Sequence, residues 1–240
     1  MVTKPSGLEL KETKLVIVEG RSDQCLIQHL MDHHEISGIQ VLCPGDLNEQ
    51  FGGVEAIVKL LGALKLNREF HQVQGILLLI DADEKPGDQF TKIRSLLQNA
   101  PGGWPVPDKL GQPARKEGIP AVTVHLLPDN ETPGAMETLL WNAAVKVADR
   151  QKLVECIETF EQCIHAYHGE QRHDEKWLPQ KRDKLKFRCL ISAVNPKNPD
   201  LPTTRLWEGE ETRALVPLDS PVFDSLVNVL QGMLVNPAKA

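Results

Sequence analysis

The sequence is short of residues on which several protein classes depend. Its five cysteines are scattered and never form a CxxC pair, which argues against a zinc knuckle and a disulfide framework. Most of these cysteines are expected to be core thiols. The single tyrosine, Tyr167, lies in an acidic helical stretch where packing is its expected role, so no tyrosine nucleophile is expected beside a site.

Long apolar runs are also missing. None reaches the length of a membrane span, and the first residues, MVTKPSGLELKETK, lack the apolar stretch of a signal peptide. We therefore expect a cytoplasmic protein with no membrane partner.

Basic residues are outnumbered by acidic ones, 27 to 33. The net charge of −6 disfavours a broad basic surface for nucleic acid, because backbone binding depends on neutralising phosphates. One basic run, KWLPQKRDKLKFR at 176–188, is either a solvated helix or strand face or a local phosphate-contacting surface. A nucleic-acid partner would be held weakly and locally.

Between residue 14 and about residue 145, strand-like and helix-like segments alternate. This order predicts a Rossmann-like α/β fold with a mainly parallel sheet flanked by helices. Ser22 or Asp23 is expected to be the N-cap of the first helix. The expected strands are 14–19, 39–45, 75–83 and 121–130, and the expected helices are 22–34, 52–66, 89–100 and 134–149.

The character of the sequence changes after residue 145. A long helical pattern covers 147–169, an amphipathic helix is expected at 220–234, and 186–196 fits either a strand or a helix. We therefore expect an α/β domain at 1–145 and a mostly helical extension at 146–240 packed on it.

Carboxylates end two of the apolar strands. Glu19 follows the first strand, and Asp81 and Asp83 close the third. Alternation along a strand predicts that the two aspartates share one side, and parallel strands bring Glu19 to the same edge of the sheet. Such acids would repel one another unless a cation neutralised them, and oxygen ligands suit Mg²⁺ or Mn²⁺.

Other interpretations of these motifs are weaker. Phosphatases with an aspartyl nucleophile also carry DxD after a strand, but they continue to Thr or Val where this chain has Lys85. Neither GxGxxG nor a P-loop motif is present. A purely structural interpretation makes the acids turn and cap residues.

The pair VEGRSD and IDADE, in this order at two strand ends, resembles the Toprim domain of topoisomerases, primases and OLD-type nucleases. The whole chain is similar to a small, poorly characterised family of stand-alone bacterial Toprim-like proteins. The resemblance implies that Glu19 is a general acid or base or a metal ligand, and that Asp81 and Asp83 hold Mg²⁺. Asp23 resembles an additional ligand of the OLD-type nucleases, although it could equally cap a helix. Glu137 is a further candidate ligand, and Glu84 is a weaker one.

These residues suggest metal-dependent phosphoryl transfer to water, as in a nuclease acting on DNA or RNA. Lys85, or a lysine of the basic run, could stabilise charge on the phosphate. One alternative is an effector or regulatory subunit that acts only with an ATPase partner. Another is a cation bound only for stability.

Overall fold

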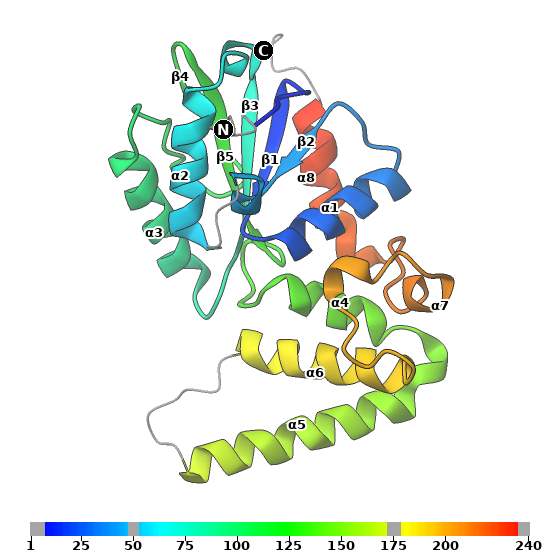
Figure 1. The fold of residues 1–240 in the computed structure, drawn as a ribbon. Helices are drawn as coiled ribbons and strands as arrows, with labels where there is room; N and C mark the ends of the chain where they lie inside the picture. The colour runs from blue at the N-terminus through cyan, green and yellow to red at the C-terminus, as the bar shows by residue number, and fades with distance from the viewer. Residues whose placement is uncertain (1–7, 48–52, 172–178, 235–240) are drawn as a thin grey trace, which may run out of the picture.

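The computed structural model describes residues 8–47, 53–171 and 179–234 (Figure 1). Their strands form one sheet in the order β2-β1-β3-β5-β4, in which only β4 is antiparallel to its neighbour. The bounds are β1 Lys14–Val18, β2 Gln40–Leu42, β3 Gly75–Asp81, β4 Ala114–Lys116 and β5 Ile119–Leu127. In the described part of the chain, no helix is both long enough and apolar enough to span a membrane.

Helices cover both faces of the sheet. α2 (Val54–Lys65) and α3 (Pro86–Asn99) lie on one face, and α1 (Arg21–His33) and α8 (Asp224–Leu234) lie on the other (Figure 1). β3 is apolar on both sides: Leu77 and Leu79 pack with α1 and α8, whereas Leu78 and Ile80 pack with α2 and α3. The predicted Rossmann-like arrangement is confirmed.

The strand order reverses between β1 and β3. The chain leaves β1 through α1 to reach β2 on one side, and then returns through α2 to β3 on the other side of β1. In open α/β sheets the carboxyl ends of the strands at such a point form the usual ligand crevice. Glu19 and Asp81 stand there.

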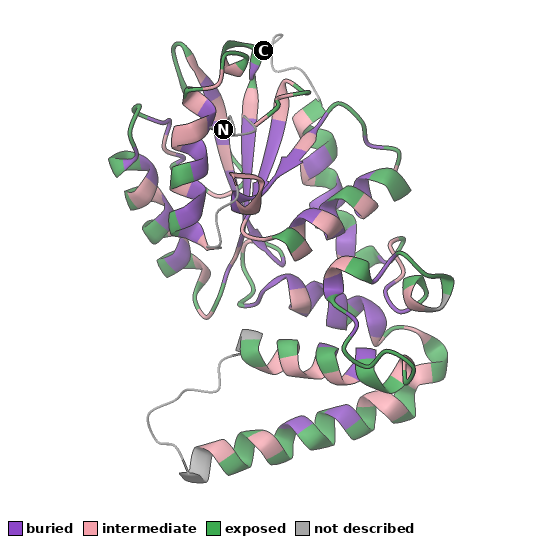
Figure 2. Ribbon diagram, in the orientation of Figure 1, coloured by how far each residue is buried: buried purple, intermediate pink, exposed green. Residues whose placement is uncertain are grey.

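After β5, the regular elements of the described chain are all helices, apart from an isolated bridge between Gly134 and Asp83. α4 (Met136–Ala144) leads to the paired helices α5 (Gln151–Gln171) and α6 (Pro179–Val194), followed by the short α7 (Glu210–Arg213) and by α8. α5 and α6 lie beyond α4, away from the sheet, with much exposed surface (Figures 1 and 2). Short 3-10 helices cover Pro44–Leu47, Phe70–Gln72, Ala148–Arg150, Thr203–Arg205 and Pro221–Phe223.

The C-terminal helices complete the core on the α1 side of the sheet. Phe187, Trp207, Phe223 and Leu230 are buried in the same cluster as Val16 of β1. This face of the sheet therefore has no closed core without the C-terminal third.

Several local expectations were wrong. Gly20 is the N-cap of α1, so neither Ser22 nor Asp23 holds that position. Most cysteines are not core thiols: Cys43 is buried, but Cys156 and Cys163 are exposed on α5. Tyr167 does not pack inside, because 60% of it is exposed. In the basic run, Lys176 lies outside the described residues.

Candidate metal centre

Glu19 lies against the end of the neighbouring strand. It follows β1, and its Oε1 accepts a hydrogen bond of 3.0 Å from the backbone N–H of Asp81, the last residue of β3. The tips of the two strands therefore meet, although 62 positions separate these residues. The second oxygen, Oε2, faces Gly53 at the start of α2; a Cβ atom added to Gly53 would lie 4.0 Å from this oxygen.

Asp81 is held by the start of α4. Its Oδ1 accepts the backbone N–H of Met136 at 3.0 Å, and Glu137 is the next residue of the helix. Free N–H groups at a helix start favour a nearby anion. The short loop from β5 to α4 thus brings Glu137 to the end of β3.

Asp23 caps α1 from inside the first turn. Its Oδ2 accepts the backbone N–H of Gly20 at 2.9 Å. Capping and metal binding are compatible here, because the bond occupies one oxygen. Glu19, Asp23 and Asp81 each have one oxygen fixed by a backbone N–H and one to which no described residue donates.

Asp83 is placed differently from the prediction. β3 ends at Asp81, and Asp83 has a positive φ of 55°, so the alternation that was expected to place both aspartates on one side stops before it. Its backbone exchanges two hydrogen bonds with Gly134. Gln89 links the pair by donating to the Asp81 carbonyl at 3.0 Å and to Asp83 Oδ2 at 3.3 Å.

Burial and mutual repulsion disfavour the charged forms of these acids. Burial raises the pKa of Glu19 to about 7, against the lowering effect of its hydrogen bond from Asp81. Burial and the charge of Glu137 raise the pKa of Asp23 to about 6. Burial, followed by the charges of Asp23, Glu19 and Glu137, raises the pKa of Asp81 well above its usual value. Four acids therefore act on one another at this edge of the sheet.

Asp83 belongs to the outer part of the cluster. Partial burial raises its pKa, while the positive charges of Lys184 and Lys92 lower it. Its own negative charge adds to the rise at Glu19.

Lys184 is the cation that reaches these acids from α6. Its Nζ lies 3.8 Å from Glu137 Oε2, and its charge lowers the pKa values of Glu19, Asp23 and Asp83. Asp183 fixes this part of α6, because its Oδ2 accepts the Thr138 hydroxyl of α4 at 2.7 Å. Lys85, by contrast, pairs with Asp88 at 3.7 Å, and both side chains are more than 70% exposed.

Sequence reasoning considered Lys184 only as one lysine of a basic run. Neither Gln89 nor Thr138 was predicted from the sequence to belong to the site. Their signal was weak because neither belongs to a motif: Gln89 reaches Asp81 and Asp83 from the first turn of α3, and Thr138 acts only by binding Asp183 of α6. The spacing of Phe187, Leu190 and Ile191 could have identified α6 as a helix, on which Lys181 and Lys184 lie about one turn apart.

The acids do not form a closed ligand cage. Among the described residues, no group of three or more His, Cys, Asp or Glu side chains is arranged so that it could hold a metal ion as it stands. Mg²⁺ does not require such a cage, since it is commonly bound through one or two carboxylates and retains several waters. The donor chemistry, all oxygen and all anionic, fits a hard divalent cation.

Comparison with known proteins gives a family and one structural likeness. The family model described as "Protein of unknown function (DUF3226)" matches residues 13–234. The C-terminal region of the OLD protein of Xanthomonas campestris pv. campestris matches with 15% sequence identity, covering 93% of this chain and 97% of that chain, at a TM-score of 0.36. A likeness at this level identifies neither a site nor an activity. No curated protein matches the chain.

Proposed function

We propose that this chain, which belongs to the family described as protein of unknown function (DUF3226), is a metal-dependent phosphodiester hydrolase that cleaves nucleic acid. The acids at the meeting point of β1 and β3 are the observation that carries this proposal. The same activity is what the Toprim resemblance of VEGRSD and IDADE implies.

The placement of the acids favours a functional role over a structural one. Buried like charges destabilise a fold, so turn and cap residues would not be expected to gather at one strand edge. Here Glu19, Asp23 and Asp81 are each held by a backbone N–H, which fixes their direction without neutralising them. A divalent cation would relieve the repulsion.

One or two carboxylates of Asp81, Asp23 and Glu137, together with water, would hold the cation, with Glu19 at its edge. A bound Mg²⁺ or Mn²⁺ would polarise a phosphate and lower the pKa of a bound water. Asp83, which is exposed and turned by its positive φ, would contribute from the outer side.

Glu19 and Lys184 would act on the substrate. Glu19 has a carboxylate oxygen free of described donors, and can orient the attacking water and accept its proton. Lys184 is half exposed and lies beside Glu137, so it can stabilise the charge that develops on the phosphate. We favour Lys184 over Lys85 for this role, because Lys85 pairs with Asp88 on the surface.

The decisive experiment is a cleavage assay on single-stranded and double-stranded DNA and RNA, after EDTA treatment and with Mg²⁺ or Mn²⁺ restored. We expect cleavage only with metal. Glu19→Gln should abolish it, and Lys184→Met should lower it at least about tenfold. Glu117→Gln, in the exposed turn before β5, and Lys181→Met, one turn along the exposed side of α6, are matched controls that should retain activity.

A second candidate is a subunit that acts only with a partner such as an ATPase. It is supported by Phe160 and Tyr167, seven residues apart on one face of α5 and 47% and 60% exposed. If the isolated protein binds metal but cleaves none of the substrates, the hydrolase proposal fails for the chain alone. This second candidate then predicts that Phe160→Ser with Tyr167→Ser abolishes partner-dependent activity.

A further inference from the structure

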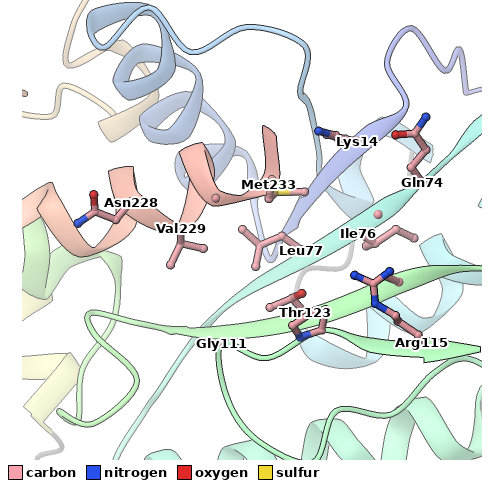
Figure 3. Close-up of a pocket in the computed structure, with 14 residues that line it drawn as sticks. Lys14, Gln74, Ile76, Leu77, Gly111, Arg115, Thr123, Asn228, Val229 and Met233 are labelled. Atoms are coloured by element: carbon pink, nitrogen blue, oxygen red, sulfur yellow. The ribbon is translucent and has the colours of Figure 1, made fainter. Parts of the chain in front are cut away.

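A cavity of about 840 Å³ lies at the other end of the sheet from the acids. It opens between α8 and the amino-terminal halves of the strands (Figure 3). We call it the α8 groove; Lys14, Leu77, Arg115, Thr123, Val229 and Met233 are among its lining residues. Its volume is within the range of small-molecule sites.

The strand register explains why the space is empty of side chains. Lys14 of β1 pairs with Gly75 of β3, which pairs with Ala121 of β5. Of these three positions, Gly75 has no side chain and Ala121 has a single methyl group. On the opposite wall, Gly232 of α8 leaves a further gap.

The groove has an apolar body and cationic margins. Leu77 forms part of its floor, while Val229 and Met233 of α8 point toward the strands (Figure 3). Lys14 and Arg115 come from strands on opposite sides of the floor. The lining contains no carboxylate, and no described acid pairs with either cation.

This chemistry favours one class of ligand. Two cations with no acidic partner among the described residues, beside an apolar groove, complement an anionic head joined to an apolar body. The lining also contains no aromatic ring on which a base could stack. Two cations are too few for a nucleic-acid backbone track.

We propose that the α8 groove binds a single-chain aliphatic anion, with the carboxylate or phosphate head between Lys14 and Arg115 and the chain against Leu77, Val229 and Met233. Free fatty acids and lysophospholipids both supply this chemistry. The inference does not depend on the proposed hydrolase activity, because the groove and the acids lie at opposite ends of the strands.

Calorimetric titration below the micelle concentration tests the proposal with three probes of equal chain length: decanoate, decyl phosphate and decanol. We expect one molecule of decanoate or decyl phosphate per chain, with decanol bound at least about tenfold more weakly. Preference for decanoate would identify the fatty-acid source, and preference for decyl phosphate the phospholipid source. Absence of binding by both anions, or equal binding of decanol, would overturn the proposal.

Matched glycine variants locate the site. Gly232→Leu places a side chain in the groove, whereas Gly62→Leu places one on α2, on the opposite face; a Cβ at either glycine meets nothing within 4 Å. We expect Gly232→Leu to lose decanoate binding and Gly62→Leu to retain it. Lys14→Gln with Arg115→Gln should make decanoate bind no better than decanol. Unchanged decanoate binding by Gly232→Leu would contradict the assigned site, and Asp81→Asn should leave this binding intact.

Discussion

Asp81 lies beside three other acids of the site. Its burial, followed by the charges of those acids, raises its pKa, while the N–H of Met136 holds one of its oxygens in place. In asparagine the amide oxygen can still accept that N–H, and the negative charge is gone. Asp81→Asn therefore separates the geometry of the site from its charge.

We predict that Asp81→Asn stabilises the metal-free protein and removes its response to metal. Each kcal/mol of relieved repulsion should raise the melting temperature by about 2–4 °C in EDTA. Wild type should gain stability in millimolar Mg²⁺, because the ion binds only the folded state, and the variant should not. Thermal melts with EDTA and with Mg²⁺ check this, with Asp200→Asn at an exposed position as control. A variant that keeps the full Mg²⁺ shift would show that Asp81 is no ligand.

His125 is a buried titratable side chain of β5. It is 1% exposed, its Nδ1 lies 3.0 Å from the Asn130 amide nitrogen, and its Nε2 has no described partner. The Asn130 oxygen accepts the N–H of Leu126, so its amide must donate to Nδ1. Burial lowers the pKa of His125 from 6.5 to about 4, although the charge of Asp129 opposes this.

The sign of the resulting pH dependence follows from proton uptake. Above pH 6.5 both folded and unfolded states hold a neutral imidazole. As the pH falls below that value, only the unfolded state binds the proton, so stability is lost between pH 6.5 and about 4. We predict that His125→Leu gains about 2 kcal/mol relative to wild type between pH 7 and pH 5. Urea unfolding at the two pH values measures the difference, and a constant difference would place a charged imidazole in the fold.

Individual site residues were predictable to different degrees. Glu19 and Asp81 could be placed from sequence because each ends an apolar run, and topology brings such ends to one edge. Lys184 could not, because its position depends on α6 docking on α4 through Thr138 and Asp183. The position of Asp83 could not be predicted either, because its positive φ is a local backbone conformation that the alternation of residues along a strand does not indicate.

At the scale of elements, one buried ion pair joins α5 to α6. Arg182 donates from Nε to Glu161 Oε1 at 2.6 Å and from a terminal nitrogen to Oε2 at 2.9 Å. The Glu161 side chain is 4% exposed, and that of Arg182 is 41% exposed. Removing the arginine alone would leave a buried carboxylate without this partner.

We predict that Arg182→Met destabilises the protein by roughly 3 kcal/mol, the lower end for breaking a buried pair, because Arg182 is partly solvated. Adding Glu161→Met should recover most of the loss. Urea unfolding of the two single variants and the double variant gives the coupling between the residues. If the double variant is no more stable than Arg182→Met, then the pair does not hold α5 on α6.

Long periodic elements were predictable, and short or ambiguous ones were not. β1, β3 and β5 follow from their apolar runs, and α2 from its amphipathic spacing. β4 was missed because three residues, Ala114–Lys116, follow a stretch rich in proline and glycine and form only an edge pairing with β5. α6 stayed undecided because its apolar positions are few, although Phe187, Leu190 and Ile191 have helical spacing.

At the scale of the whole molecule, two hydrophobic clusters lie on opposite faces of one sheet. Trp104 belongs to the cluster under α2 and α3. Trp207 and Trp141 belong to the cluster under α1 and α8, which residues before and after position 145 build together. The strands β1 and β3 contribute side chains to both clusters, so the loss of one cluster should disrupt the other.

We therefore predict that the α/β part and the helical extension unfold as one cooperative unit. Two variants with a single tryptophan each report one cluster. The first keeps only Trp104 and the second keeps only Trp207; in both, Trp141 and Trp177 are replaced by Phe, together with the other cluster's tryptophan. Fluorescence and far-UV circular dichroism should give the same urea midpoint in each variant.

A chain cut after residue 145 should show no cooperative transition, because the face beneath α1 would lose the buried side chains Phe187, Phe223 and Leu230. A Trp207 fluorescence midpoint well below the far-UV midpoint of the same variant, or a cooperatively folding 1–145 fragment, would instead mean that the sheet is stable without its C-terminal helices.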